Sequence, residues 1–177
     1  MAIKRYVAEA DNTITNAFES NLATRATKAN MGAADVLETF VIHGQTSASI
    51  SAESAEEARI IIQFPISGTD TAIETIHRDR NDNKIPAQGK VSFYLRMFNA
   101  PHAESTPEDF DLDVKIISKS WSEGRGLDMD TYSDTGFSSF LSASSGSAWN
   151  EPGGDFHSLT DTDNFSASVN FKHGFED

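Results

Sequence analysis

Two runs in which apolar and polar side chains alternate constrain this chain most. In "KVSFYLRMFNAP" the apolar face comprises Val91, Phe93, Leu95 and Met97. In "FDLDVKIISKSW" it comprises Phe110, Leu112, Val114 and Ile116. A period of two is typical of a strand with one buried face, so both runs predict strands. Because the runs follow each other and an acidic loop joins them, we expect an antiparallel sheet.

Shorter runs extend this β pattern along the chain. Further strands are predicted in "IKRYVA", in "NTITNAF", at Val36–Ile42, in "ARIIIQFPIS" and at Phe165–Phe171. Pro65 removes a backbone donor and indicates a strand end. Ile73 and Ile76 are spaced as on one face of a helix, so residues 69–78 predict one short helix. The segment "SAESAEEA" before Arg59 is too short for a stable isolated helix and is interpreted as a loop or single turn.

Length and composition limit the architecture. The chain has 177 residues and no cysteine, so we expect a single domain, residues 1–177, held by a hydrophobic core and not by disulfides. Short strands, little helix and long loops rich in Gly, Ser, Asp and Asn predict an all-β fold. The expected form is an antiparallel β-sandwich of jelly-roll type, with long polar loops and at most one short helix.

The charge excludes some classes of partner. The formal net charge is -13, and it is concentrated in residues 91–177, which contain 15 acidic and 5 basic residues. This field repels phosphate groups, so we expect neither nucleic acid nor an anionic membrane as a partner. The first residues lack the apolar run of a signal peptide, so synthesis in the cytoplasm without export is expected.

No arrangement of residues indicates catalysis. The histidines are scattered and show no His-Glu-x-x-His pattern, and the chain has neither a Gly-x-Ser-x-Gly turn nor a phosphate-binding glycine loop. We therefore expect a protein that is not an enzyme and needs no cofactor.

Closely spaced acids raise one metal hypothesis. Asp128, Asp130 and Asp134 offer oxygen ligands of the kind that calcium prefers, although no EF-hand pattern is complete and solvated turns explain the same residues. The stretch "DRNDNK" also begins like a calcium loop, but Lys84 stands where glycine belongs.

Three aromatic residues raise a second hypothesis. Trp121 ends an alternating run, so we expect its ring to cap the core. If Trp121, Tyr132 or Trp149 instead faces solvent beside polar groups, it becomes a platform on which a sugar ring stacks.

The order of several motifs resembles a known family. The motifs are "ADNTI", "NMGAADVLETFVI", "ARIIIQFPIS", "KVSFYLRMFNAP", "DLDVKIISKSWSEG" and "SAWNEPGGDF". Taken in this order they resemble the DNRLRE-type domain, a jelly-roll module akin to carbohydrate-binding modules. The long loop from Gly126 to Phe156 also resembles stand-alone structural proteins in the virions of tailed bacteriophages.

The resemblance implies a function. We expect a capsid decoration or cement protein that binds the major capsid protein and copies of itself in a symmetric assembly, with the segment Ala2–Ala8 among its contact edges. A neck, tail or baseplate component of the virion is an alternative. A carbohydrate-binding or adhesion module that recognises host glycans is the alternative from another class.

Overall fold

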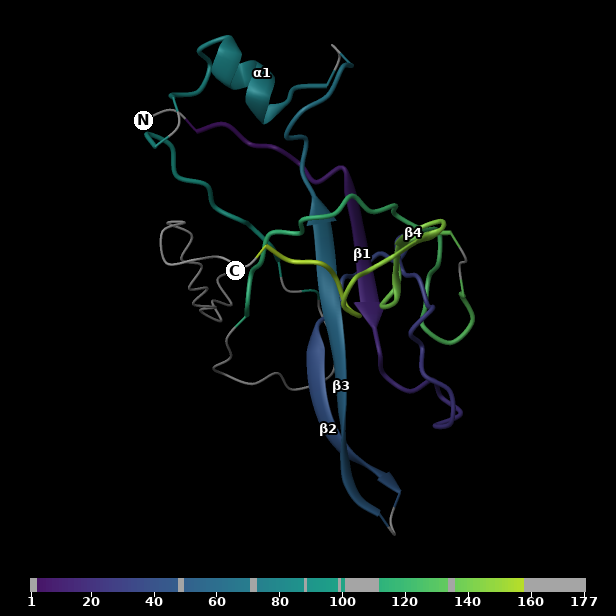
Figure 1. Ribbon diagram of the computed structural model, residues 1–177. Helices are drawn as coiled ribbons and strands as arrows, with labels where there is room; N and C mark the ends of the chain where they lie inside the picture. The colour runs from purple at the N-terminus through teal and green to yellow at the C-terminus, as the bar shows by residue number, and fades with distance from the viewer. Residues whose placement is uncertain are drawn as a thin grey trace.

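The protein is described here by a computed structural model, which covers residues 3–47, 50–70, 73–87, 89–98, 100, 112–133 and 136–157. Its regular elements in these ranges are β1 (Ala10–Thr15), β2 (Phe40–Ser47), β3 (Ile50–Gln63), α1 (Ile76–Asn81), β4 (Ser142–Ser144) and β5 (Ser147–Ala148) (Figure 1). The sheets are antiparallel, and a single short helix accompanies them within the described residues. The prediction of a mainly-β fold with at most one short helix is therefore confirmed for this part of the chain.

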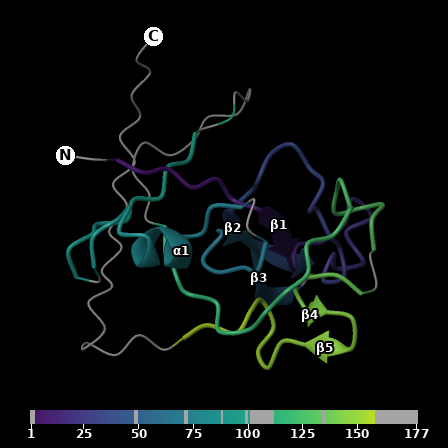
Figure 2. The ribbon, with the colours of Figure 1, turned by 90° about the horizontal axis from the view of Figure 1, so that it is seen from above.

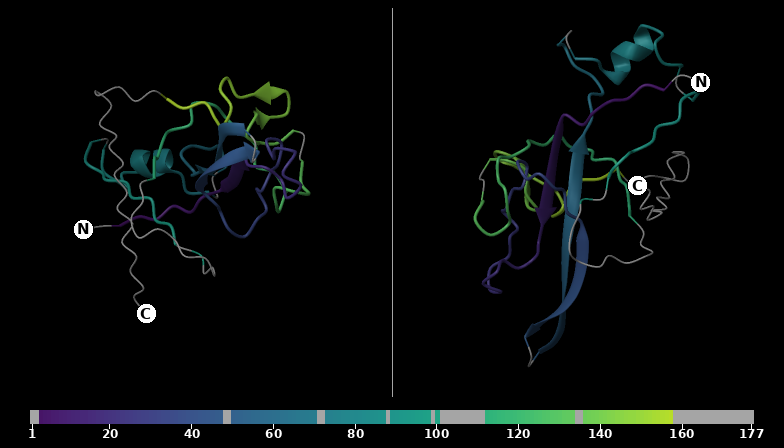
Figure 3. Two further views of the ribbon diagram at one scale, coloured as in Figure 1. Left: turned by 90° about the horizontal axis from the view of Figure 1, so that it is seen from below. Right: turned by 180° about the vertical axis from the view of Figure 1, so that it is seen from behind.

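The main sheet has the strand order β1-β3-β2. The half of β3 from Ala58 to Gln63 pairs with β1, and the half from Ile50 to Ala58 pairs with β2. The β-branched run "RIII" suits the first of these halves, where Ile61 is buried against the core. Beyond the end of β1, β2 and β3 continue as a two-stranded hairpin, which projects away from the end of the molecule that carries α1 (Figure 3).

A smaller hairpin covers the side of the main sheet. It consists of β4 and β5, which lie beside the main sheet when the molecule is viewed along its strands (Figure 2). Ala143 in β4 is fully buried, and its carbonyl accepts a hydrogen bond from the Ser122 amide at 3.0 Å. This hairpin therefore connects the loop after Trp121 to the core.

The structure corrects several predicted boundaries. The strand expected at Val36–Ile42 begins at Phe40 and continues to Ser47. The segment "SAESAEEA" is not a loop but part of β3, because pairing with β2 overrides its helix-forming composition. The helix expected over residues 69–78 is α1, which begins only after Thr75, whose hydroxyl accepts a hydrogen bond from the Arg78 amide at 3.2 Å.

The prediction of a strand in "KVSFYLRMFNAP" is wrong for the described residues, since residues 91–98 form no ladder there. The run from Leu112 is likewise irregular and makes only an isolated bridge between Ile117 and Phe156. The segment from Ile3 to Ala8 is not a paired strand either. Alternation of apolar and polar residues gives a segment one apolar and one polar face. A strand also needs the edge of a neighbouring strand with which its backbone can form hydrogen bonds. The strand predicted at 165–171 lies outside the described residues.

The core combines small apolar side chains with buried amides. Ile14, Ala26, Ala143, Phe140 and Trp149 are buried, and so are Asn12, Asn30 and Ser138. The amide groups of Asn12 and Asn30 both donate to the Ser138 carbonyl, at 3.1 and 2.8 Å. The Asn12 carbonyl oxygen accepts from the Met31 amide at 2.9 Å, so that buried polar atoms satisfy each other.

Glycines make room for Asn30. The Asn30 side-chain oxygen accepts hydrogen bonds from the amides of Gly32 and Gly126, each at 3.1 Å. A Cβ atom at Gly124 would lie 1.7 Å from that oxygen, and one at Gly126 would lie 1.6 Å from the Asn30 carbonyl oxygen. The two glycines of "GRG" are therefore required by close approach of the backbone to Asn30.

Arg59 ties β3 to the loop that follows β5. Its guanidinium lies 5.7 Å from the ring centre of Phe140 and 5.4 Å from that of Phe156. It donates to the Gly153 carbonyl at 2.9 Å and to Glu57 at 2.7 Å. This arginine thus joins segments that are far apart in the sequence.

We predict that Gly124→Ala lowers the free energy of unfolding by about 3 kcal/mol, because the added methyl group overlaps the buried Asn30 side chain. Urea unfolding followed by circular dichroism measures the effect. Gly68→Ala is the matched control, since its Cβ would have only one neighbour, at 3.8 Å, and should change stability by less than about 0.5 kcal/mol. Equal effects of the two substitutions would contradict the close packing around Asn30.

Candidate functional site

The N-terminal segment forms an extended arm across the end of the molecule near α1 (Figure 1). Its side chains alternate between half-buried and exposed from Ile3 to Glu9. Lys4 and Tyr6 belong to the half-buried set, whereas Ile3 and Val7 are each 82% exposed. The arm therefore presents apolar side chains to its surroundings while its other face is held against the protein.

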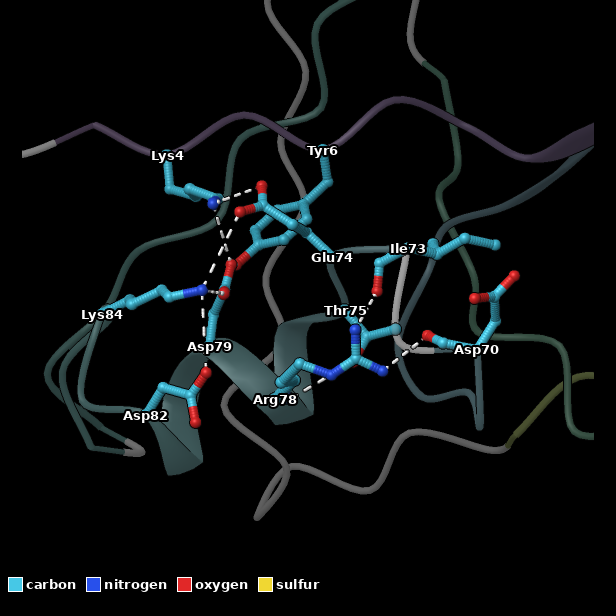
Figure 4. Close-up of polar contacts among 10 residues, drawn as sticks. All are labelled: Lys4, Tyr6, Asp70, Ile73, Glu74, Thr75, Arg78, Asp79, Asp82 and Lys84. Carbon is cyan, nitrogen blue, oxygen red and sulfur yellow. Dashed lines mark hydrogen bonds and ion pairs between the residues drawn. The ribbon is translucent and has the colours of Figure 1, made fainter.

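A cluster of charged groups around Asp79 holds this arm, and we call it the Asp79 clamp (Figure 4). The Tyr6 hydroxyl donates to Asp79 Oδ2 at 2.8 Å, and Lys4 Nζ lies 3.1 Å from the same oxygen. Lys84 Nζ forms an ion pair with Asp79 Oδ1 at 3.3 Å. The Asp79 side chain is 0% exposed. A carboxylate buried this completely needs such partners, because burial without them is costly.

Helix α1 and the loop before it position the carboxylates. Glu74, on that loop, accepts a hydrogen bond from Lys4 at 2.6 Å. Arg78 donates to the Asp70 carbonyl at 2.6 Å and also to the Ile73 carbonyl, which fixes the same loop. The N-terminal arm, the loop and α1 are thereby joined through polar contacts (Figure 4).

The pKa values of the clamp follow from these contacts. Burial, together with the hydrogen bond to Asp79, raises the pKa of Tyr6 to about 12. The Tyr6 hydroxyl lowers the pKa of Asp79 against the opposing effect of burial, and Lys4 lowers it further. Hydrogen bonds to Glu74 and Asp79 raise the pKa of Lys4 above 10.5. At neutral pH the carboxylate is charged and the phenol is protonated, so the cluster is suited to holding the arm in place.

Exposed apolar side chains gather on the segment from Val91 to Phe98. The exposed fractions are 61% for Phe93, 87% for Tyr94, 45% for Leu95 and 79% for Phe98. The Arg96 guanidinium lies 4.7 Å from the centre of the Phe98 ring. Large apolar groups grouped in this way are typical of a surface that binds another protein. We call residues 91–98 the apolar segment.

Two of the three aspartates considered as calcium ligands, Asp128 and Asp130, accept hydrogen bonds from backbone amides. Asp128 accepts hydrogen bonds from the Thr131 amide at 2.7 Å, the Thr131 hydroxyl at 2.6 Å and the Asp130 amide at 2.9 Å. The Thr131 contacts lower the pKa of Asp128. Asp130 accepts from the Ser20 amide at 2.8 Å, and Asp134 lies outside the described residues. Within the described ranges, no group of three or more His, Cys, Asp or Glu side chains is arranged to hold a metal ion.

The three aromatic residues considered for sugar stacking have different environments. Trp149 is 5% exposed and its indole N–H donates to the Ser139 carbonyl at 2.8 Å, so its ring is part of the core. Trp121 is half-buried. Tyr132 is 37% exposed. A stacking platform needs an open ring face, which the burial of Trp149 does not provide.

The Asp79 clamp has no local signature in the sequence. Tyr6 and Asp79 are separated by 73 positions, and no local motif connects them. The only signal was the incomplete calcium-like stretch "DRNDNK", in which Lys84 replaces a glycine. In the structure this lysine supplies a positive charge to Asp79, the first residue of that stretch.

The chain was compared with known protein families, with curated proteins and with solved structures, and no match was found. Among the described residues, no helix is long and apolar enough to cross a membrane. We therefore infer function from the exposed segments and charged groups of the molecule itself.

We predict that Tyr6 makes stability depend on pH under alkaline conditions. The raised pKa means that its contribution is fully present below pH 10.0 and is lost as the pH rises to about 12. In Tyr6→Phe this part of the pH dependence should be absent, as measured by urea unfolding across the same range. Tyr132→Phe removes the same hydroxyl from a more exposed site and serves as the control. If the two variants show the same dependence of unfolding free energy on pH, the contact with Asp79 does not raise the pKa of Tyr6.

Proposed function

We propose that this chain is a structural protein of a tailed-bacteriophage virion, which decorates the outer surface of the head shell and reinforces it. The observation that carries this proposal is the apolar segment, whose exposed aromatic side chains suit a protein interface. The proposed partners are the major capsid protein and further copies of this chain. Adhesion, and not catalysis, is the proposed activity.

The N-terminal arm adds a second contact to this proposal. The Asp79 clamp holds Lys4 and Tyr6, so that Ile3 and Val7 are presented outward. An extended segment of this kind is suited to strand addition at a neighbouring subunit. Each contact is small, but copies in a lattice bind through many equivalent contacts, and the combined affinity exceeds that of one contact.

We also propose that the finer architecture is a β-sandwich of jelly-roll type. The antiparallel pairing of both described sheets supports this proposal, and so does the position of β3 between two strands that precede it in the sequence. In a jelly roll, neighbouring strands are often distant in the chain.

A place in the neck, tail or baseplate would use the same surfaces and differs from decoration in copy number. Glycan recognition is less well supported, because Trp149 is buried and Trp121 is half-buried. A change in tryptophan fluorescence on addition of host glycans would favour that function instead.

The number of copies per purified particle tests the proposed function. We expect quantitative mass spectrometry to find this polypeptide at a copy number comparable to that of the major shell protein. A copy number in the range of one ring would place the chain in the neck or tail. Its absence from particles would reject the virion proposal.

Removing the exposed aromatic groups should weaken binding to shells. We predict that Phe93→Ser combined with Phe98→Ser lowers affinity by about 30-fold or more, the effect of losing one strong interface contact. Co-sedimentation with shells that lack the protein measures this affinity. Tyr132→Ser is the control, because it removes an exposed aromatic ring outside the apolar segment. Unchanged binding by the double variant would exclude the apolar segment as the shell contact.

A further inference from the structure

The outer edge of β2 is open for pairing in the described part of the molecule, where β2 is an edge strand of the order β1-β3-β2. The hydrogen bonds of Glu57 show toward which neighbouring strand the backbone N–H and C=O groups of each β3 residue point. Its amide donates to the Asn16 side chain at 2.7 Å, and its carbonyl accepts from the Asn16 amide at 3.2 Å, both on the β1 side.

Backbone groups of successive residues in a strand point to opposite sides. Ala58 and Glu56 of β3 therefore face β2, where their partners in the register are Phe40 and Ile42. It follows that Val41 and His43 direct their N–H and C=O groups away from β3, toward the open edge. Val41 is 67% exposed, so this edge combines unused backbone groups with apolar surface.

The apolar segment has the complementary properties. Within the described ranges, no backbone hydrogen bond joins residues 91–98 to another segment. Its sequence alternates as a strand does, and Phe93 and Leu95 are exposed on the same predicted face. The eight residues of β2 match the eight residues from Val91 to Phe98 in length.

Charge indicates that these two elements attract each other. Residues 35–57, which include β2 and half of β3, contain five acidic residues and no Lys or Arg; one of the five, Glu57, is paired with Arg59. Residues 89–98 contain Lys90 and Arg96 and no acidic residue. This local attraction opposes the general repulsion between two copies that each carry a net charge of -13.

We propose that residues 91–98 of one copy add as a strand to the open edge of β2 in a second copy. Within one chain, the apolar segment runs from the side of α1, whereas β2 extends along the hairpin that projects the other way (Figures 1 and 3). The two surfaces differ, so the contact is head to tail and each copy offers both halves. Repetition produces a ring or a continuing chain of copies.

If the chain decorates a head shell, this contact joins neighbouring copies on that shell, and in this respect the inference rests on the proposed function. The contact itself is a property of the chain alone, so it can be tested on the purified full-length protein by sedimentation. We expect the wild-type protein to form species larger than the monomer, in amounts that rise with protein concentration.

Two variants block opposite halves of the contact. Val41→Pro removes a donor at the open edge without removing a hydrogen bond to β3, a position where edge strands tolerate proline. Phe93→Asp with Leu95→Asp places negative charge opposite the acidic hairpin. Each variant alone should associate at least about tenfold more weakly than wild type. Leu127→Asp changes an exposed leucine elsewhere and should associate like wild type.

An equimolar mixture of the two variants gives the decisive result. One variant retains an intact apolar segment and the other an intact β2 edge, so the mixture should form one-to-one dimers and no larger species. Such dimers also show that both variants are folded. Association of either variant at the wild-type level, no dimer in the mixture, or a wild-type chain that stays monomeric up to about 1 mM would overturn the proposal.

The outcomes separate this contact from the proposed function. A monomeric chain that is present on particles at shell-like copy number would reject the strand addition and leave decoration standing. A chain that associates through this contact but is absent from particles would reject decoration and leave the contact standing.

Discussion

The arrangement of the described elements depends on β3 pairing with two different strands. Ala58 is the point where the two pairings meet, since it stands opposite both Thr15 of β1 and Phe40 of β2. Its small side chain is 3% exposed, which fits a position enclosed by neighbours on both sides. The adjacent Arg59 then connects β3 to the loop at Gly153. The half of β3 that pairs with β1 thus lies in the core, and the half that pairs with β2 forms the projecting hairpin.

Part of this arrangement was predictable from the sequence. The run "ARIIIQF" indicates a buried strand because β-branched residues favour a pleated, packed surface, and it forms half of β3. The other half, "SAESAEEA", has helix-forming composition and becomes a strand only because β2 lies beside it. The alternating run at 91–98 shows the opposite case. Its pattern is that of a strand, but no described segment of the same chain lies in register with it.

The polar contacts were not predictable, because their partners are distant in the sequence. The turn composition at Asn30 and Gly32 was visible, yet the hydrogen bond from Gly126 to Asn30 spans 96 positions. The Asp79 clamp likewise joins the N-terminal arm to α1 through residues that have no common motif. The acids Asp128 and Asp130 were visible as a cluster; in the structure Asp128 accepts hydrogen bonds from the amides of Asp130 and Thr131, whereas Asp130 accepts one from Ser20, 110 positions away. Local sequence thus identified polar turns, and the fold determined what they contact.

The polar character of the core also affects how stability varies with temperature. Fully buried groups among the described residues include the side chains of Asn12, Asn30, Asp79 and Ser138 beside those of Ile14 and Ala143. Exposing apolar surface on unfolding raises the heat capacity, whereas exposing polar surface lowers it. A core with this mixture therefore has a smaller heat-capacity change than an apolar core of equal area. Its stability curve is correspondingly broad, so the fold loses little stability on cooling.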